Sequence, residues 1–180
     1  MGFFVQGTKG SADERNRIYD IDKKVLWNWR EDDALQLEER HQIANFADFC
    51  NDCGNCDIFC PEDGGPYVIK PRFFGSTKVW SESPDLDGFL IEHGAAGDKV
   101  LGRFDGVEYA LEVAGGSCRF QGDSFDVTFE REDPRGTLGG EATGELDLTY
   151  CFIMDYIRQA VLSGESVNYV NSLVSGGGDS

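Results

Sequence analysis

Residues 88–130 read "GFLIEHGAAGDKVLGRFDGVEYALEVAGGSCRFQGDSFDVTFE" and decide the expected fold of the second half of the chain. Apolar and polar residues alternate here in short runs, and Gly or Asp separates one run from the next. Alternation with a period of two is typical of strands with one buried face, and regularly spaced turn residues join such strands. The stretch predicts an antiparallel meander of four or five strands, with a hairpin turn at "DGVEY".

Helices are expected both before and after this stretch of the sequence. After it, "ELDLTYCFIMDYIRQAVLSG" predicts a long helix and "ESVNYVNSLV" a short final one, while residues 132–144 predict a loop. Before it, "ALQLEERHQIANFADF" lacks Gly and Pro and predicts a helix from Asp33 to Phe46. The apolar residues at helical spacing in the long helix are Leu146, Tyr150, Ile153, Ile157 and Val161.

Four of the six cysteines fall within residues 50–61, "CNDCGNCDIFCP". Cys50, Cys53, Cys56 and Cys60, followed by Pro, match the run C-x2-C-x2-C-x3-C-P with which bacterial ferredoxins bind [4Fe–4S] clusters. The two-residue gaps aim three sulfurs at three corners of one cubane, and in two-cluster ferredoxins the fourth cysteine binds the neighbouring cluster. Gly54 lets the backbone pass close to the cluster. The expected cofactor is a [4Fe–4S] cluster.

Other interpretations of these cysteines are weaker. Structural zinc prefers two separated pairs of ligands, and disulfides do not suit a reducing compartment. The fourth ligand of the first cluster stays open between Cys60, Cys151 and a cysteine of a partner subunit. Cys118 and Cys151 are otherwise expected to be small buried thiols, and His41 and His93 isolated surface residues.

Composition limits the partners and the compartment. The chain of 180 residues carries 33 acidic and 16 basic residues, which gives a formal net charge of −17. Such a surface repels phosphate backbones and anionic lipid, so nucleic acid and membrane are poor partners. No apolar run approaches the roughly 20 residues of a membrane span, and the first residues do not resemble a secretory signal. We therefore expect a cytoplasmic protein that is not inserted into a membrane.

Residues 49–74, "FCNDCGNCDIFCPEDGGPYVIKPRFF", resemble the C-terminal iron–sulfur segment of the selenate reductase subunit family. Its members are large flavin- and NAD(P)H-dependent oxidoreductases related to the glutamate synthase small subunit and dihydropyrimidine dehydrogenase. "SPDLDGFLIE" and "ELDLTYCFIMDYIRQAVL" are similar, more weakly, to the segments that follow in that family. By this resemblance, Cys50, Cys53, Cys56 and Cys60 match the family's cluster cysteines. The family has an upstream cysteine motif and dinucleotide-binding domains, whereas this sequence has no cysteine before Cys50 and no G-x-G-x-x-G.

These observations lead to one expected architecture, of class α+β. Residues 1–39 would form an arm and a helix, and 40–80 a ferredoxin-like [4Fe–4S] module. Residues 81–174 would form an accessory domain with a small antiparallel sheet and a C-terminal helix, and 175–180 a flexible tail.

The expected function follows from the cysteines and the resemblance. The chain would be a non-catalytic subunit that relays electrons between a flavin/NAD(P)H subunit and a terminal subunit, for which the family's associations point to molybdenum. One partner would carry a complementary cysteine motif, so that two clusters could be shared across the interface. The alternative is a docking adaptor with a structural metal site, either Fe–S or zinc.

Overall fold

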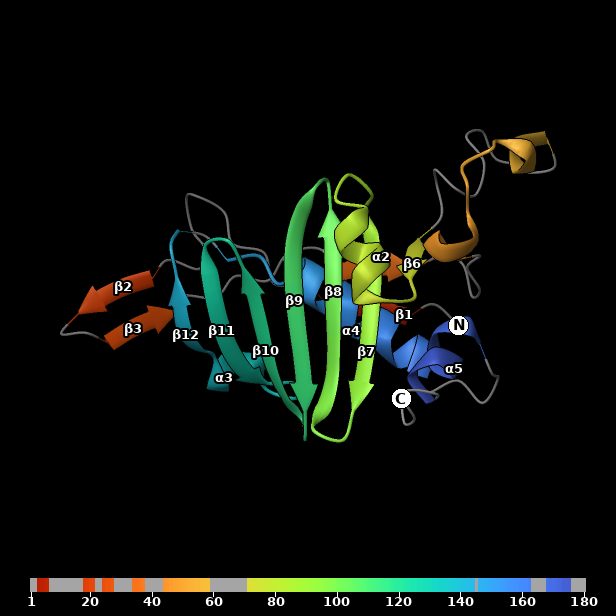
Figure 1. The fold of residues 1–180 in the computed structure, drawn as a ribbon. Helices are drawn as coiled ribbons and strands as arrows, with labels where there is room; N and C mark the ends of the chain where they lie inside the picture. The colour runs from red at the N-terminus through yellow and green to blue at the C-terminus, as the bar shows by residue number, and fades with distance from the viewer. Residues whose placement is uncertain are drawn as a thin grey trace.

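The computed structural model describes residues 3–6, 18–21, 24–27, 34–37, 44–58, 71–144, 146–162 and 168–175. Its main feature is a mixed sheet of eight described strands, in the order β12-β11-β10-β9-β8-β7-β6-β5 (Figure 1). The N-terminal segments form two antiparallel strand pairs, β1 with β4 and β2 with β3. In chain order the strands are β1 (Phe3–Gln6), β2 (Ile18–Ile21), β3 (Lys24–Trp27), β4 (Ala34–Leu37), β5 (Asn45–Phe46), β6 (Arg72–Phe74), β7 (Gly88–Gly94), β8 (Gly97–Phe104), β9 (Val107–Ala114), β10 (Ser117–Gly122), β11 (Phe125–Glu130) and β12 (Gly139–Ala142).

The centre of the sheet is the meander that the sequence predicts. Strands β7 to β11 pair in chain order, each antiparallel to the next. The turn between β8 and β9 consists of Asp105 and Gly106, which have φ angles of 51° and 76°. A two-residue turn in the left-handed region matches the twist of the strands that it joins. The antiparallel meander and its hairpin turn at "DGVEY" are therefore confirmed.

Two short strands extend the sheet beyond β7 in the parallel sense. β5 pairs with β6, and β6 pairs with β7. A hairpin cannot join neighbouring parallel strands, because the chain must first return to the end at which it started. The helix α2 (Thr77–Glu82) lies in the return from β6 to β7. The cysteine segment lies in the return from β5 to β6.

The fold class predicted from the sequence is therefore wrong. It placed a ferredoxin-like cysteine module before a small antiparallel sheet, whereas the segments on both sides of the cysteines are strands of one large mixed sheet. β5 and β6 have only two and three residues, which is too short for a period to be recognised. Their pairing with β7 depends on residues far along the chain. The division of the sequence into four parts stays a prediction.

Two predictions of local structure are also wrong. The helix expected from Asp33 to Phe46 contains β4 and β5 instead. Helix propensity is a weak preference, and the pairing of β4 with β1 overrides it. The loop expected at 132–144 contains the short helix α3 (Pro134–Thr137) and the edge strand β12. Asp133 caps α3 by accepting a hydrogen bond from the backbone N–H of Gly136.

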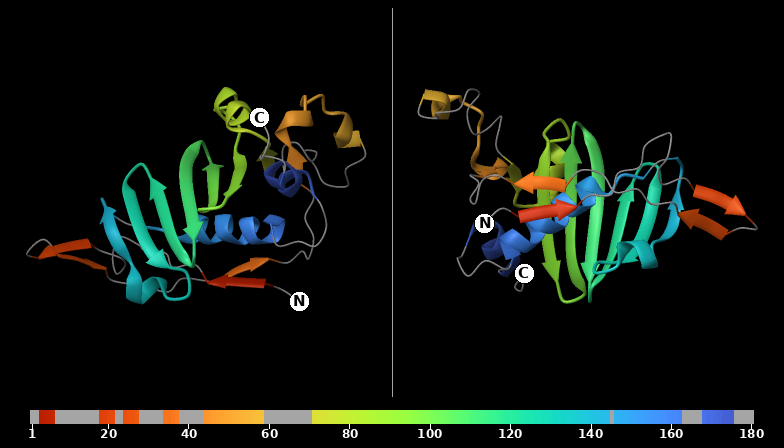
Figure 2. Two further views of the ribbon diagram at one scale, coloured as in Figure 1. Left: turned by 60° about the horizontal axis from the view of Figure 1, so that its bottom comes forward. Right: turned by 180° about the vertical axis from the view of Figure 1, so that it is seen from behind.

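Helix α4 (Thr149–Leu162) crosses one face of the sheet (Figure 2). Its residue Met154 is buried in the same apolar cluster as Phe120 of β10 and Val100 of β8. A Cβ at Gly102 of β8 would lie 3.0 Å from the sulfur of Met154. The glycine therefore makes room for the helix to pack directly on the strand, and this layer forms the main core.

Both predicted C-terminal helices are confirmed, the long one as α4 and the short one as α5 (Tyr169–Ser175). No helix in the described part of the chain is both long and apolar enough to span a membrane. The cytoplasmic location stays a prediction.

On the opposite face, α2 covers the corner of the sheet at β6 and β7. Trp80 of α2 packs edge-on against Phe74, with ring centroids 5.1 Å apart. The guanidinium of Arg103 lies 4.1 Å from the centroid of the Trp80 ring and donates to the carbonyls of Ser83 and Leu86 at 2.8 and 2.7 Å. This buried cation stacks on the indole and fixes the return from α2 to β7.

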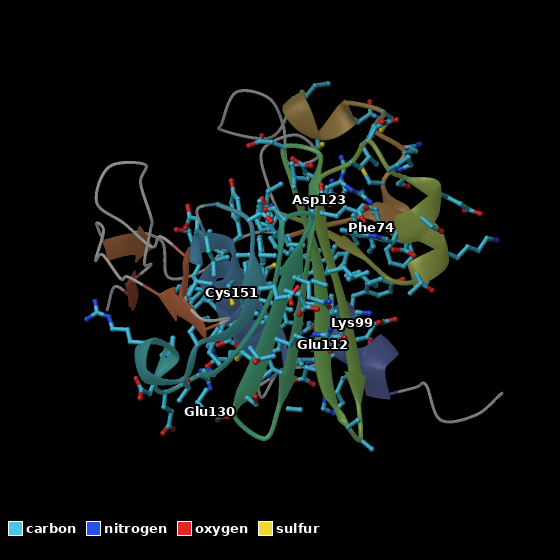
Figure 3. All side chains as sticks on the ribbon, turned by 90° about the vertical axis from the view of Figure 1, so that its left-hand side faces the viewer. Phe74, Lys99, Glu112, Asp123, Glu130 and Cys151 are labelled. Carbon is cyan, nitrogen blue, oxygen red and sulfur yellow. The ribbon has the colours of Figure 1, made fainter. Side chains whose placement is uncertain are left out.

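The remainder of that face is polar and carries a row of alternating charges. Glu92, Lys99, Glu112 and Arg119 are successive cross-strand neighbours from β7 to β10, and Figure 3 labels the central two. Arg119 also forms an ion pair with Asp126 of β11 at 2.7 Å. Opposite charges on neighbouring strands stabilise a sheet by about 0.2–1 kcal/mol per pair. The charged side chains of this face are therefore suited to contact with solvent.

Candidate metal centre

The three described cysteines of the cluster motif lie in residues 47–58, which follow β5 in the return to β6 and which we call the cysteine loop. In Figure 1 these residues extend away from the edge of the sheet near β6. At the base of the loop the backbone N–H of Asn45 donates to the carbonyl of Pro71 at 2.8 Å. The N–H of Gly75 donates to the carboxylate of Asp48 at 2.7 Å. These hydrogen bonds hold the start of the loop against the strand that follows it.

The backbone turns sharply on both sides of Cys53. Asp52 has a φ of 50° and Gly54 a φ of 74°, so both lie in the left-handed region. Few residues other than glycine adopt this conformation, and aspartate is one that tolerates it. Gly54, which the sequence analysis singles out, thus has a backbone conformation that favours glycine. Its role towards a cluster stays a prediction.

The three thiols differ in their surroundings. Cys53 and Cys56 are exposed, and Cys50 is partly buried. The thiol of Cys50 donates to the carboxylate of Asp52 at 3.1 Å. That carboxylate in turn lies 3.5 Å from a guanidinium nitrogen of Arg72 in β6, whose side chain is only 10% exposed. Asp52 therefore connects the first cysteine of the loop to a buried cation of the sheet.

The donor chemistry of the loop fits the expected cofactor, because thiolates are the soft ligands that iron–sulfur clusters and zinc select. Within the residues that the structure describes, no three His, Cys, Asp or Glu side chains gather into a group that could hold a metal ion. Cys60, the fourth cysteine of the motif, lies outside the described residues. The ligand set Cys50, Cys53, Cys56 and Cys60 stays a prediction.

The other two cysteines lie in the main core, as the sequence predicts. Cys118 is 3% exposed and Cys151 2%. Burial raises the pKa of the Cys118 thiol to about 11, and the Asp155 carboxylate adds to this increase. Burial raises the pKa of Cys151 well above its ordinary value. Because the thiolate is the form that binds metal and reacts, burial lowers the reactivity of both thiols in the folded chain.

Two large apolar side chains lie exposed in the cysteine loop. Phe49 is 73% exposed and Ile58 is 79% exposed, although both are large hydrophobic residues. Phe49 makes one edge-on aromatic contact, with Tyr169 of α5 at a centroid distance of 4.7 Å. Most of the apolar surface of both side chains is therefore in contact with water.

A second group of polar side chains was missed by the sequence analysis, which treats His93 as isolated. The Nδ1 atom of His93 is hydrogen-bonded to the carboxylate of Asp98, and Arg158 of α4 binds the same carboxylate. His93 and Asp98 are cross-strand partners in the hairpin of β7 and β8. Counting outward from the turn "GAAG" would have placed them opposite each other.

Comparison with known proteins gives a similarity to oxidoreductases. The chain is 38% identical over 56 residues to "Putative oxidoreductase YgfK" of Escherichia coli strain K12, and equally to that of Escherichia coli O157:H7. The match covers 31% of this chain but only 5% of the length of each relative. No family model matches the chain, and no solved structure gives a significant match. The link to oxidoreductases is thus confirmed in general terms, and the selenate reductase family is not.

Proposed function

We propose that this chain is an electron-transfer subunit of an oxidoreductase and that the cysteine loop holds a [4Fe–4S] cluster. The observation that carries the proposal is the difference in accessibility among the cysteines. Cys53 and Cys56 lie exposed in a sharply turned loop, whereas Cys118 and Cys151 are buried. The cysteine spacing supports a cluster rather than another metal. The partial similarity to an oxidoreductase supports a redox role.

In this proposal Cys50, Cys53 and Cys56 supply three thiolates, and Cys60 is the preferred fourth ligand. Cys151 is a poorer candidate, because its burial and raised pKa disfavour the thiolate. Cys50 would exchange its hydrogen bond to Asp52 for a metal bond. The cation of Arg72 would then keep the released carboxylate compensated.

When bound, a [4Fe–4S] cluster accepts and donates one electron at a time. The role of the chain is to hold this centre at an accessible surface. The exposure of Cys53 and Cys56 allows a redox partner to approach the loop closely. We propose a flavin/NAD(P)H subunit on one side and a terminal subunit, molybdenum-dependent as the resemblance implies, on the other.

The same loop is the proposed docking surface for one of these subunits. Phe49 and Ile58 are apolar anchors near the thiols, and buried anchors of this kind carry much of the affinity of an interface. The partner would bring its own cysteines. Together with Cys60 they would bind a second cluster, and ligand sharing would couple assembly to metal binding.

The cluster is tested by iron and sulfide analysis of the anaerobically purified chain, expressed alone and with its partner subunits. We expect about four irons per cluster, and an absorbance band in the visible range that dithionite bleaches. Cys53→Ser should remove most of the iron. Cys118→Ser is the matched control, because it removes a buried thiol that cannot act as a ligand, and the iron content should stay unchanged.

The alternative is an adaptor with a structural metal site. It predicts one firmly bound zinc, or a cluster that dithionite does not reduce, and either result would replace the electron-transfer proposal. If Cys118→Ser loses as much iron as Cys53→Ser, the ligand assignment is wrong. Four irons held firmly by the chain alone would exclude shared clusters.

A further inference from the structure

A pocket of about 390 Å³ lies at the end of the sheet where two hairpins turn. Its walls come from the turn between β7 and β8, the turn between β9 and β10, Arg131 after β11, and Arg158 on α4. In Figure 1 these turns lie at the lower end of the sheet, and the cysteine loop extends near the upper end. The volume falls in the range of small-ligand sites, roughly 300–1,000 Å³.

Small residues keep this pocket open. One turn has the sequence Gly94-Ala95-Ala96-Gly97, and Gly115 and Gly116 form the other. A Cβ built at Gly115 would meet no atom within 4 Å. Gly115 and Gly116 have φ angles of 57° and 97°, which favour glycine at both positions. A ligand can therefore lie against the backbone of these turns.

Arg158 is the buried cation of the pocket, and all three nitrogens of its guanidinium already donate to carboxylates of the protein. Its Nε and one terminal nitrogen donate to Asp155 at 2.9 and 2.7 Å, and its other terminal nitrogen donates to Asp98. The side chain is only 12% exposed. Arg158 therefore positions the two carboxylates and has little capacity to bind a ligand directly.

Arg131 is the cation that remains available. Its Nε donates to Asp155 at 2.7 Å, and the side chain is 42% exposed. Its two terminal nitrogens make no hydrogen bond or ion pair with the residues that the structure describes. A guanidinium held by one nitrogen presents the other two as a fixed fork, the geometry that binds a carboxylate through both oxygens.

His93 also lines the pocket, and its neutral ring offers a hydrogen-bond acceptor. Asp98 binds its Nδ1, so the proton of the neutral ring resides on that nitrogen. The Nε2 atom then accepts a hydrogen bond, and it has no partner among the described residues. A ligand that contacts both Arg131 and His93 needs an anionic group and a hydroxyl that donates.

We propose that this pocket binds a small hydroxycarboxylate, with the carboxylate on Arg131 and the hydroxyl donating to Nε2 of His93. A carboxylate oxygen of Glu130 would lie 3.8 Å from a Cβ at Gly116, so a negative charge borders the site. It repels a dianion more than a monoanion, which favours a hydroxycarboxylate over monohydrogen phosphate. The proposal rests on these side chains and not on the electron-transfer function.

The test is a titration of the full ¹⁵N-labelled chain by NMR at pH 7 and constant ionic strength. Glycolate is the probe, and acetate, which lacks the hydroxyl, and inorganic phosphate are the comparisons. We expect saturable shifts at the amides of Gly94, Gly97, Gly115 and Gly116 with glycolate, at a dissociation constant of about 1 mM for so small a ligand. Acetate and phosphate should bind at least about threefold more weakly.

Three variants separate the two contacts. Arg131→Gln should weaken glycolate and acetate alike, by about tenfold, because a charged hydrogen-bond donor is lost. His93→Leu, which removes every side-chain acceptor at this position, should bring glycolate down to the level of acetate and leave acetate unchanged. Arg119→Gln is the matched control, because Arg119 is similarly exposed, at 47%, and paired with one aspartate on the polar face. It should change neither affinity.

Three results would overturn the proposal. The first is the absence of saturable shifts at the four glycines up to a glycolate concentration of about 50 mM, far above the expected dissociation constant. The second is equal binding of glycolate and acetate by the wild-type chain, which would remove the hydroxyl contact. The third is unchanged glycolate binding by His93→Leu, a variant at a side chain that is 56% exposed and so should fold normally.

Discussion

The cysteines of this chain fall into two groups with opposite surroundings. Those described in the cysteine loop reach the surface, while Cys118 and Cys151 lie between the sheet and α4. The side chain is the same in both groups, but burial holds the core pair in the protonated form. The difference teaches that the placement of a thiol, rather than the number of cysteines, marks where metal or redox chemistry can occur.

The phenylalanines repeat this contrast. Phe120 is fully buried beneath α4, and Phe49 is 73% exposed beside Cys50. A phenylalanine that stays mostly in water removes little apolar surface on folding and so contributes little to stability. The two regions therefore differ in what they contribute. The meander buries the side chains that stabilise the fold, and the cysteine loop exposes thiols and apolar side chains at the surface.

The largest expected effect concerns thiol reactivity. In the metal-free, reduced chain at pH 8, a thiol-specific reagent should label Cys53 and Cys56 first. With a pKa of about 11, only about one Cys118 side chain in a thousand is a thiolate at that pH. An ordinary thiol, with a pKa of 9.0, has a thiolate fraction about a hundredfold higher at that pH. Labelling followed by peptide mass spectrometry should therefore find Cys118 and Cys151 modified at least about a hundredfold more slowly. Denaturant should expose all six cysteines, and fast labelling of Cys151 in the folded chain would break the comparison.

The next effect concerns stability, tested with the matched substitutions Phe120→Ala and Phe49→Ala. Phe120→Ala should lower the free energy of unfolding by about 3–5 kcal/mol, because it leaves a cavity in the main core. Phe49→Ala loses one edge-on contact with Tyr169 and should lower that free energy by about 1 kcal/mol or less. Chemical denaturation of both variants measures the difference. Similar losses in the two variants would show that the loop is part of the core.

The smallest effect concerns pH. The pKa of Cys118 is raised in the folded state, from its ordinary value of 9.0 to about 11, so the folded chain keeps a proton that the unfolded chain releases. Stability should be unaffected by this group below pH 9 and fall by about 2 kcal/mol as the pH rises to 11. Cys118→Ala should remove that part of the decrease. Tyr109, whose pKa is also raised, titrates in both proteins and cancels in the difference.

The sequence predicts the meander and α4 because their signals are local and repeated. Alternation over whole strands, and the turn at Asp105 and Gly106, specify pairs of neighbouring strands. β12, "GGEA", has two glycines in four residues and no strand signature, so its pairing with β11 decides its conformation. β5 and β6 are equally short, and their place beside β7 is set by contacts remote in sequence.

For the candidate sites, too, the sequence predicts local patterns but not contacts between remote residues. The cysteine spacing predicts the donor atoms, since it is a pattern of residue types along the chain. It does not predict that Arg72 reaches Asp52 or that Phe49 and Ile58 remain exposed. The pair of His93 and Asp98 follows from strand register, and Arg131 joins the pocket only because β11 and α4 meet there.

The position of the cysteine loop between two parallel strands restricts how this segment can change during evolution. A connection between neighbouring parallel strands needs about a dozen residues or more. Insertions above that length lose little stability, because the entropy of closing a loop grows only slowly with its length. Deletions below it would separate β5 from β6. A descendant that had lost every cysteine here would therefore still need a long connection between β5 and β6 at this edge of the sheet.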